Sequence, residues 1–282
     1  MPGVRGNTFR QRMKTADRSS LRVDYDQIAS SYNQRYEASH MGGVLSALQT
    51  LARDVEAERI VEIGCGTGRW LADLSSERRQ VFGLDPSSGM LEEAGKRNHC
   101  LQLVRGRGGQ LPFLAETFDL VFCVNAIHHF DDPQGFVSEA RRVLGSDGAL
   151  AVAGSDPHRR REEWYVYDFF DGTYETDLAR FPTWEGIASW MSASGFSQVE
   201  QHVVERIVDH KIGREVLEDP FLAKHACSQL ALLSDEAYAA GLRRIEAALV
   251  DAEAAGETLI FPTNILLAMI VGRKAGNHER MK

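Results

Sequence analysis

The stretch that decides the fold is Arg59-Ile-Val-Glu-Ile-Gly-Cys-Gly-Thr-Gly-Arg-Trp70. Its apolar run ends at a cluster of glycines, which is typical of a buried parallel strand that feeds a tight turn. Gly64, Gly66 and Gly68 leave the backbone without side chains, where either a ligand or the next helix comes close. Such a loop at the carboxyl end of a strand predicts a nucleotide-type pocket.

The chemistry of this loop indicates the kind of nucleotide. Its spacing is Gly-x-Gly-x-Gly, whereas the turn that binds a dinucleotide pyrophosphate has Gly-x-Gly-x-x-Gly. Glu62, two residues before the first glycine, suits a cationic ligand better than a diphosphate. Asp85 follows a second apolar run, residues 81–84, where a carboxylate can accept both hydroxyls of a ribose. The sequence therefore predicts a nucleoside ligand that carries a positive group.

Four motifs follow one another in an order that resembles the class I S-adenosylmethionine-dependent methyltransferases. They are Glu-x-Gly-x-Gly-x-Gly at 62–68, Gly-Leu-Asp-Pro-Ser-x-x-Met-Leu at 83–91, Leu-Pro-Phe at 111–113 and Phe-Asp-Leu-Val at 118–121. Together they are far more specific than a glycine loop alone. The resemblance implies an α/β fold, with a Rossmann-like, doubly wound, seven-stranded and mostly parallel sheet. It also implies S-adenosylmethionine as cofactor and S-adenosylhomocysteine as product.

The resemblance assigns cofactor contacts to named positions. In the family, the residue at the place of Met90 packs beside the adenine and the one at Asp85 holds the ribose. Relatives usually have Gly-Asp-Ala-Glu before Leu-Pro-Phe, but this chain has Gly-Arg-Gly-Gly at 106–109. Arg107 cannot accept a hydrogen bond, so either backbone groups of the following glycines read the adenine edge or Arg107 stacks on the ring. The predicted cofactor contacts are Tyr32, Glu62, Gly64, Cys65, Gly66, Gly68, Asp85, Pro86, Met90, Arg107, Gly108, Gly109 and Asn125.

Three residues are candidates for catalysis. Transfer of a methyl group from a sulfonium needs alignment and exclusion of water more than covalent help, but an oxygen acceptor also needs a base. His129, with His128 beside it, is the candidate, because imidazole titrates near neutral pH. In some small-molecule O-methyltransferases that the chain resembles, a histidine after the fourth strand does that work, helped by an acid at the place of Asp156. The histidines can equally order the loop or cap the next helix. These three residues would form an incomplete set of metal ligands, so no metal site is predicted.

The rest of the chain divides by its composition. Residues 1–20 are polar and basic, which predicts a disordered leader or, alternatively, a targeting or binding arm. Residues 21–57 predict helices, one of which presents two tyrosines on one face. The family resemblance implies that this segment is an N-terminal helical lid whose tyrosines fold over the cofactor, and the alternative is that they pack the helix on the domain. The core is expected at 58–208 and 258–274, and a tail at 275–282.

Two segments are expected to choose the methyl acceptor. Residues 157–182 are dense in aromatic side chains and depart from regular structure, which suggests a cap over an apolar or ring-bearing acceptor or a small satellite core. Residues 209–257 are helical and separate two expected strands, 198–207 and 264–272, that the family ordinarily joins by a tight hairpin. They suggest either a lid over the substrate or an oligomerisation face.

Composition excludes several classes of function. The chain of 282 residues is 43% hydrophobic and 26% charged, which is typical of a globular protein, and its formal net charge of −8 argues against a nucleic-acid substrate. It has no apolar run of about 20 residues to span a bilayer and no signal-peptide core, so a cytoplasmic location is expected. The four cysteines are scattered, which indicates neither a zinc site nor a disulfide framework.

These observations predict a methyltransferase that uses S-adenosylmethionine and methylates a small molecule at an oxygen. Methylation at nitrogen or carbon is the alternative, and so is a non-catalytic protein that binds S-adenosylmethionine or another nucleotide, which the residue Arg107 keeps open. A nucleotide-dependent oxidoreductase is disfavoured by the glycine spacing and by Glu62. Neither a nucleic acid nor a membrane is expected as a partner, and the protein is expected to be a monomer or a homodimer.

Overall fold

The computed structural model describes residues 23–29 and 41–275. Its middle layer is an eight-stranded sheet in the order β3-β2-β1-β4-β5-β8-β6, with β7 paired to β8. β1 to β5 run parallel, and β8 is antiparallel to β5, β6 and β7. The strands are β1 Arg59–Ile63, β2 Gln80–Asp85, β3 Gln102–Arg105, β4 Phe118–Val124, β5 Leu144–Gly154, β6 Glu163–Trp164, β7 Phe196–Ile212 and β8 Ile260–Lys274. The seven longer strands confirm the predicted Rossmann-like α/β fold, to which the two-residue β6 is an addition.

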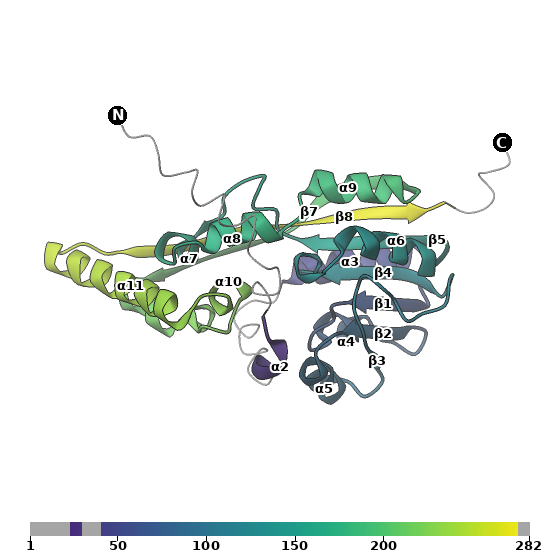
Figure 1. Ribbon diagram of the computed structural model, residues 1–282, viewed down its shortest axis with the longest axis horizontal. Helices are drawn as coiled ribbons and strands as arrows, with labels where there is room; N and C mark the ends of the chain where they lie inside the picture. Colours follow the sequence, from purple (N-terminus) through teal and green to yellow (C-terminus); the bar gives the residue numbers. More distant parts are fainter. Residues whose placement is uncertain (1–22, 30–40, 276–282) are drawn as a thin grey trace.

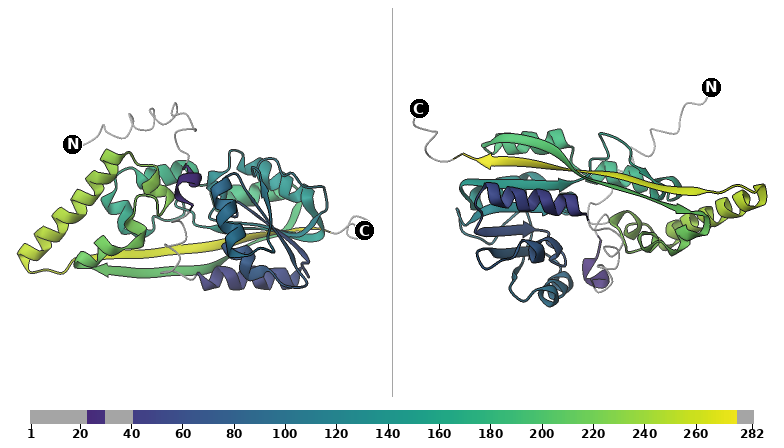
Figure 2. Two further views of the ribbon diagram at one scale, coloured as in Figure 1. Left: turned by 90° about the horizontal axis from the view of Figure 1, so that it is seen from below. Right: turned by 180° about the vertical axis from the view of Figure 1, so that it is seen from behind.

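Helices cover both faces of this sheet (Figures 1 and 2). Alternate residues of a strand point to opposite faces, so Val61 and Ile63 of β1 enter one apolar cluster and Ile60 enters the other. The first cluster takes its helical residues from α6 and α9, and the second takes them from α3, α4 and α5. These helices are α3 Gly42–Asp54, α4 Arg69–Leu74, α5 Ser88–Arg97, α6 Pro133–Val143 and α9 Trp184–Ala193.

β7 and β8 continue beyond this core as a two-stranded ribbon that carries a second, mostly helical lobe (Figure 1). The expected strands 198–207 and 264–272 are too short, because the pairing extends from Phe196 opposite Lys274 to Ile212 opposite Ile260. The expected helical segment 209–257 therefore begins with strand residues. The lobe consists of α7 Tyr165–Phe169, α8 Thr173–Arg180, α10 Ser228–Ala231, α11 Asp235–Ala255 and the 3-10 turns η4 Gly213–Glu218 and η5 Pro220–Leu222.

The prediction that residues 157–182 lack regular structure is wrong, since β6, α7 and α8 lie within them. Their aromatic side chains form an apolar core of their own, in which Trp164, Tyr165 and Phe170 pack with Ile245 and Leu249 of α11. Short helices here are stabilised by burial of aromatic surface rather than by local periodicity. Most of the segment therefore contributes to a satellite core, which was the alternative to a cap, while residues 179–182 at its end line the cavity described below.

The two helices α5 and α6 begin at side-chain caps. The Ser87 side chain accepts a hydrogen bond from the Met90 amide at the start of α5, and Asp132 accepts one from the Gly135 amide before α6. Near the N-terminus, the described part of the expected lid helix is α2 Tyr25–Ile28. The predicted leader 1–20, Tyr32 and nearly all of the tail 275–282 lie outside the described residues. Within the described ranges, no helix is long and apolar enough to cross a bilayer.

We predict that Gly241→Ala destabilises the helical lobe. Alanine normally stabilises a helix interior relative to glycine, but a β-carbon at Gly241 of α11 would overlap the Phe170 ring. Overpacking should therefore lower the free energy of unfolding by about 1–3 kcal/mol, as measured by urea denaturation followed by circular dichroism. Gly95→Ala in α5 is the control, because its β-carbon would lie 3.7 Å from Leu103 Cδ1. Equal or higher stability of Gly241→Ala would contradict the close packing.

Candidate functional site

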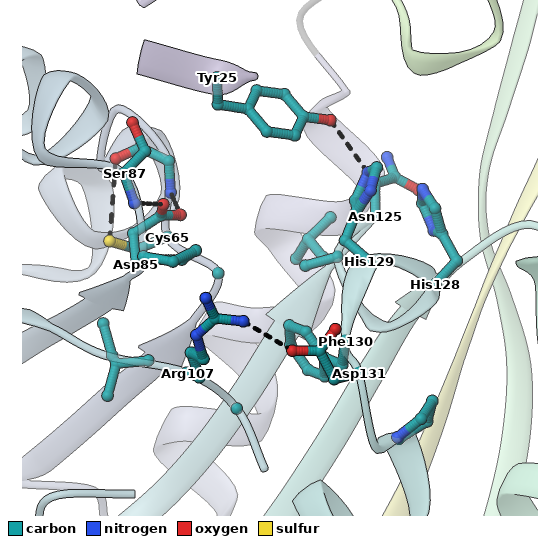
Figure 3. Close-up of a pocket in the computed structure, with 18 of the residues that line it drawn as sticks. Tyr25, Cys65, Asp85, Ser87, Arg107, Asn125, His128, His129, Phe130 and Asp131 are labelled. Atoms are coloured by element: carbon teal, nitrogen blue, oxygen red, sulfur yellow. Dashed lines mark hydrogen bonds and ion pairs between the residues drawn. The ribbon is translucent and has the colours of Figure 1, made fainter. Parts of the chain in front are cut away.

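A cavity of about 980 Å³ opens where β1, β2 and β4 end, between the sheet and α2. Its walls come from the glycine loop, the loop after β3, the 3-10 turn η3 Ile127–His129 and the end of α8. Figure 3 shows the side chains that enter it. Of the predicted site residues, the structure brings together Glu62, Gly64, Cys65, Gly66, Asp85, Pro86, Met90, Arg107, Gly108, Gly109, Asn125, His128 and His129.

Asp85 holds the glycine loop against the start of α5. Its Oδ2 accepts a hydrogen bond from the Gly66 amide and its Oδ1 accepts one from the Ser87 amide, each at 2.9 Å. Each carboxylate oxygen has two lone pairs, so one acceptor position remains on each for hydroxyl groups of a ligand. Burial raises the pKa of Asp85, and the two amide hydrogen bonds oppose that rise.

Glu62 is a buried acid with an unsatisfied oxygen. Its side chain ends at the cavity and is 1% exposed, and none of the described residues gives its Oε2 a hydrogen bond. Burial, together with the negative charge of Asp85, raises the pKa of Glu62 well above its ordinary value. Buried polar atoms in proteins normally have partners, so this carboxyl group fits a cationic ligand that would neutralise it.

Two of the three loop glycines, Gly66 and Gly68, have different roles. Gly66 has a φ of +50°, and a β-carbon there would meet nothing within 4 Å, so the loop lies open beside the cavity. Gly68 has a φ of +69°, and a β-carbon there would lie 2.9 Å from Leu101 Cδ1 and 3.0 Å from the Ala94 β-carbon. Gly68 does not line the cavity. It is therefore needed for helix packing rather than for the predicted ligand contact.

The described part of the N-terminal lid is attached to the core by Asp26, which the sequence analysis did not single out. Asp26 Oδ1 accepts hydrogen bonds from Ser87 Oγ at 2.7 Å and from the Gly89 amide at 2.8 Å. The amide and the hydroxyl lower the pKa of Asp26. Ile28 of α2 also packs against Met90 of α5. These contacts place Tyr25 at the edge of the cavity.

Arg107 forms an ion pair with Asp131, with 2.7 Å between Nη1 and Oδ2, across the cavity (Figure 3). Both side chains are about half exposed, so this pair contributes little to stability. A β-carbon at the neighbouring Gly108 would lie 3.1 Å from the Phe130 ring, so the backbone there passes close to an aromatic wall. Either predicted mode of adenine contact is compatible with this arrangement.

His129 lies between two polar side chains. Its Nε2 is 3.0 Å from the Tyr25 hydroxyl and its Nδ1 is 3.2 Å from Arg180 Nη2. The neighbouring His128 stacks on Phe181 with 3.8 Å between ring centroids. Burial, followed by the charges of His129 and Arg180, lowers the pKa of His128 well below its ordinary value, so its imidazole is neutral at physiological pH.

The position of Asp156 does not support the predicted assisting role. Its Oδ1 accepts the His158 amide and its Oδ2 accepts the Trp184 amide, each at 2.9 Å. It is 5% exposed and does not line the cavity. Both oxygens thus fasten backbone amides, one of them in the first turn of α9, and this explains why an acid stands there.

The helical lobe contributes to the site through the end of α8 only. Arg180 and Phe181 line the cavity, whereas none of residues 209–257 does. Sequence analysis missed Arg180, whose side chain is 5% exposed and pairs with the buried Asp177. The only sequence signal is an Asp and an Arg three residues apart, which is usually a solvated surface pair.

Among the described residues, no group of three or more His, Cys, Asp or Glu side chains could hold a metal ion.

We predict that Glu62→Gln stabilises the ligand-free protein above pH 4.5. The carboxyl group has an ordinary pKa of 4.5, which folding raises well above that value. Above pH 4.5 the Glu62 carboxyl group loses its proton freely in the unfolded chain. In the folded protein it must either keep the proton or become a buried charge, and both lower the free energy of unfolding. Glutamine does not ionise, so the variant avoids this loss. The free energy of unfolding should rise by about 1–3 kcal/mol at pH 8 and by almost nothing at pH 4.

Urea denaturation across this pH range tests the prediction. The control is Glu58→Gln, which changes an exposed glutamate directly before β1. A gain that does not depend on pH would show that the penalty is not one of ionisation.

Comparisons with known proteins identify the domain that holds this cavity. The family profile described as a methyltransferase domain matches residues 61–152. The chain is 30% identical over 127 residues to a demethylmenaquinone methyltransferase of Thermotoga maritima, and the aligned region covers 44% of this chain and 56% of that protein. It is 32% identical over 117 residues to a phthiotriol/phenolphthiotriol dimycocerosates methyltransferase of Mycobacterium leprae, and the aligned region covers 40% of this chain and 43% of that protein. The chain thus spans about half the length of these curated relatives.

Solved structures agree on the fold. A SAM-dependent methyltransferase from Thermotoga maritima superimposes with a TM-score of 0.54 at 23% identity and covers 89% of this chain and 98% of that one. At this identity the likeness shows the fold alone. Residues 61–152, which the family profile matches, form a class I S-adenosylmethionine-dependent methyltransferase domain.

Proposed function

We propose that this protein uses S-adenosylmethionine to methylate an oxygen atom of a small molecule. The observation that carries the proposal is the pair of buried acids, Glu62 and Asp85, beside an open glycine loop in a cavity of about 980 Å³. Asp85 retains acceptor positions for ribose hydroxyls, and Glu62 has an oxygen that a cationic group could satisfy. A nucleoside that carries a positive charge matches both.

The cofactor, when bound, supplies a methyl group that its sulfonium has already activated. The chain's own residues would hold and shield it. Asp85 would bind the ribose, Met90 and the backbone at Gly108 would contact the adenine, and α2 would cover it, because Asp26 fastens that helix beside Ser87. Exclusion of water strengthens the electrostatic contacts inside such a site.

The acceptor would occupy the other end of the cavity. That end is lined by His128, His129, Arg180 and Phe181, and so combines aromatic surface with hydrogen-bonding groups. Such walls suit a small organic acceptor. Two curated relatives are named for methyl transfer to demethylmenaquinone and to phthiotriol or phenolphthiotriol dimycocerosates, which supports a small molecule as the acceptor here.

We predict that Asp85→Asn weakens binding of S-adenosylhomocysteine at least roughly tenfold, because charged acceptors form the stronger hydrogen bonds. Asparagine keeps the shape but presents an N–H to one of the two amides that Asp85 accepts. Isothermal titration of the intact protein and the variant measures the difference. Asp147→Asn, at an exposed position of β5 with a positive φ that asparagine tolerates, is the matched control. Binding of NADH with no binding of S-adenosylmethionine would favour an oxidoreductase instead.

Turnover distinguishes an enzyme from a binding protein. Incubation with methyl-labelled S-adenosylmethionine and a small-molecule extract should transfer label to the extract, and Asp85→Asn sets the background. Tight cofactor binding without transfer to any acceptor would support the non-catalytic alternative.

A further inference from the structure

A buried hydrogen-bonding network in the helical lobe is centred on Asp177, whose other oxygen faces Arg180. Asp177 is fully buried, and its Oδ2 accepts hydrogen bonds from the Tyr167 hydroxyl and from Gln229 Nε2, each at 2.7 Å. Its Oδ1 lies 3.6 Å from Arg180 Nη1. These contacts come from α7, α8 and α10, and together they fix the guanidinium at the wall of the cavity.

The Arg180 guanidinium determines where His129 carries its proton. A guanidinium only donates hydrogen bonds, so the 3.2 Å contact from Arg180 Nη2 makes His129 Nδ1 the acceptor. A neutral imidazole then has its proton on Nε2, and Nε2 donates to the Tyr25 hydroxyl 3.0 Å away. Figure 3 shows Tyr25 and His129 facing each other. Both ring nitrogens of His129 are thus committed.

This arrangement opposes proton uptake by His129. Nε2 already holds a proton, and a second proton on Nδ1 would face the positive guanidinium at 3.2 Å. In the part of the chain that the structure describes, the titratable groups next to this ring include Tyr25 from α2, His128 from the same turn, and Asp177 behind the guanidinium. Asp177 is directed at Arg180 rather than at His129, so it does not compensate the repulsion.

We propose that Arg180 is a positioning residue that holds His129 as the Nε2–H tautomer, so that the cavity is built for an acceptor oxygen that is already anionic. Carboxylates and acidic enols or phenols share this chemistry. The acceptor oxygen forms its new bond to the methyl carbon while the carbon–sulfur bond breaks toward sulfur. One negative and one positive charge cancel, and no proton has to leave. The acceptor part rests on the proposed function, whereas the tautomer does not.

The tautomer can be measured without any substrate. In protein labelled with ¹⁵N-histidine, two-bond proton–nitrogen correlations distinguish protonated from unprotonated ring nitrogens, and His129→Gln identifies the signal among the nine histidines. The intact protein should show Nε2–H and no titration of His129 between pH 8 and pH 5.5. Arg180→Leu should mix the tautomers and let His129 titrate near about 6.5, while Arg180→Lys, which keeps a cationic donor, should restore the single tautomer.

Arg214→Leu, which removes an exposed ion pair with Glu253, is the control and should leave the His129 signal unchanged. An Nδ1–H tautomer in the intact protein would overturn the proposal even if Arg180→Leu does not fold. A folded Arg180→Leu with an unchanged His129 signal would overturn it as well.

The acceptor class is tested with protein saturated by S-adenosylhomocysteine. Benzoate should bind roughly tenfold more tightly than benzyl alcohol, which has the same ring but no charge, and Arg180→Leu should remove the difference. Benzoate that binds no better than benzyl alcohol contradicts the anionic acceptor. If S-adenosylhomocysteine itself does not bind, the proposed function fails while the tautomer result stands.

Discussion

The carboxylate of Asp85 joins the pieces from which the cavity is made. It accepts one amide from the glycine turn and one from the residue that caps α5, and both bonds are 2.9 Å long. Ser87 in turn donates its hydroxyl to Asp26 of the lid helix. The glycine turn, α5 and α2 are therefore linked through one side chain that is 8% exposed. Because a buried acceptor without partners is costly, these loops are held together even before a ligand is present.

The two ends of the cavity have opposite electrostatic character. Glu62 and Asp85 place two buried acids at one end, and burial raises the pKa of both. Arg180 places a buried guanidinium at the other end, where burial lowers its pKa. Each group has been removed from water with incomplete compensation. A ligand that is cationic at the acidic end, and a partner that is anionic at the other, would each recover part of that cost.

The parts of the site that could be predicted are those encoded in adjacent residues. The apolar run, the glycines, Asp85 and the Ser87 cap all lie within short motifs, and β1 and β2 bring them together by parallel pairing at a known register. Arg180 could not be predicted in this way, because it reaches His129 across 51 residues. It faces Asp177, which accepts a hydrogen bond from Gln229 of a separate helix. The backbone contacts of Asp156 could not be predicted for the same reason. Its place after β5 is local information, but the two amides that occupy it are not.

The helical lobe influences the site at a distance. None of residues 209–257 lines the cavity. Gln229 of α10 nevertheless donates a hydrogen bond to Asp177, which lies 3.6 Å from Arg180. Phe181, at the end of α8, stacks on His128. The lobe packs around its own aromatic core, which is separate from the two clusters under the sheet. Substitutions in that core can therefore shift α8 by small amounts, and with it the guanidinium, without touching Asp85 or the glycine loop. Under the proposed function, such an arrangement would separate acceptor choice from cofactor binding, since changes at distant sites with no shared contacts act independently.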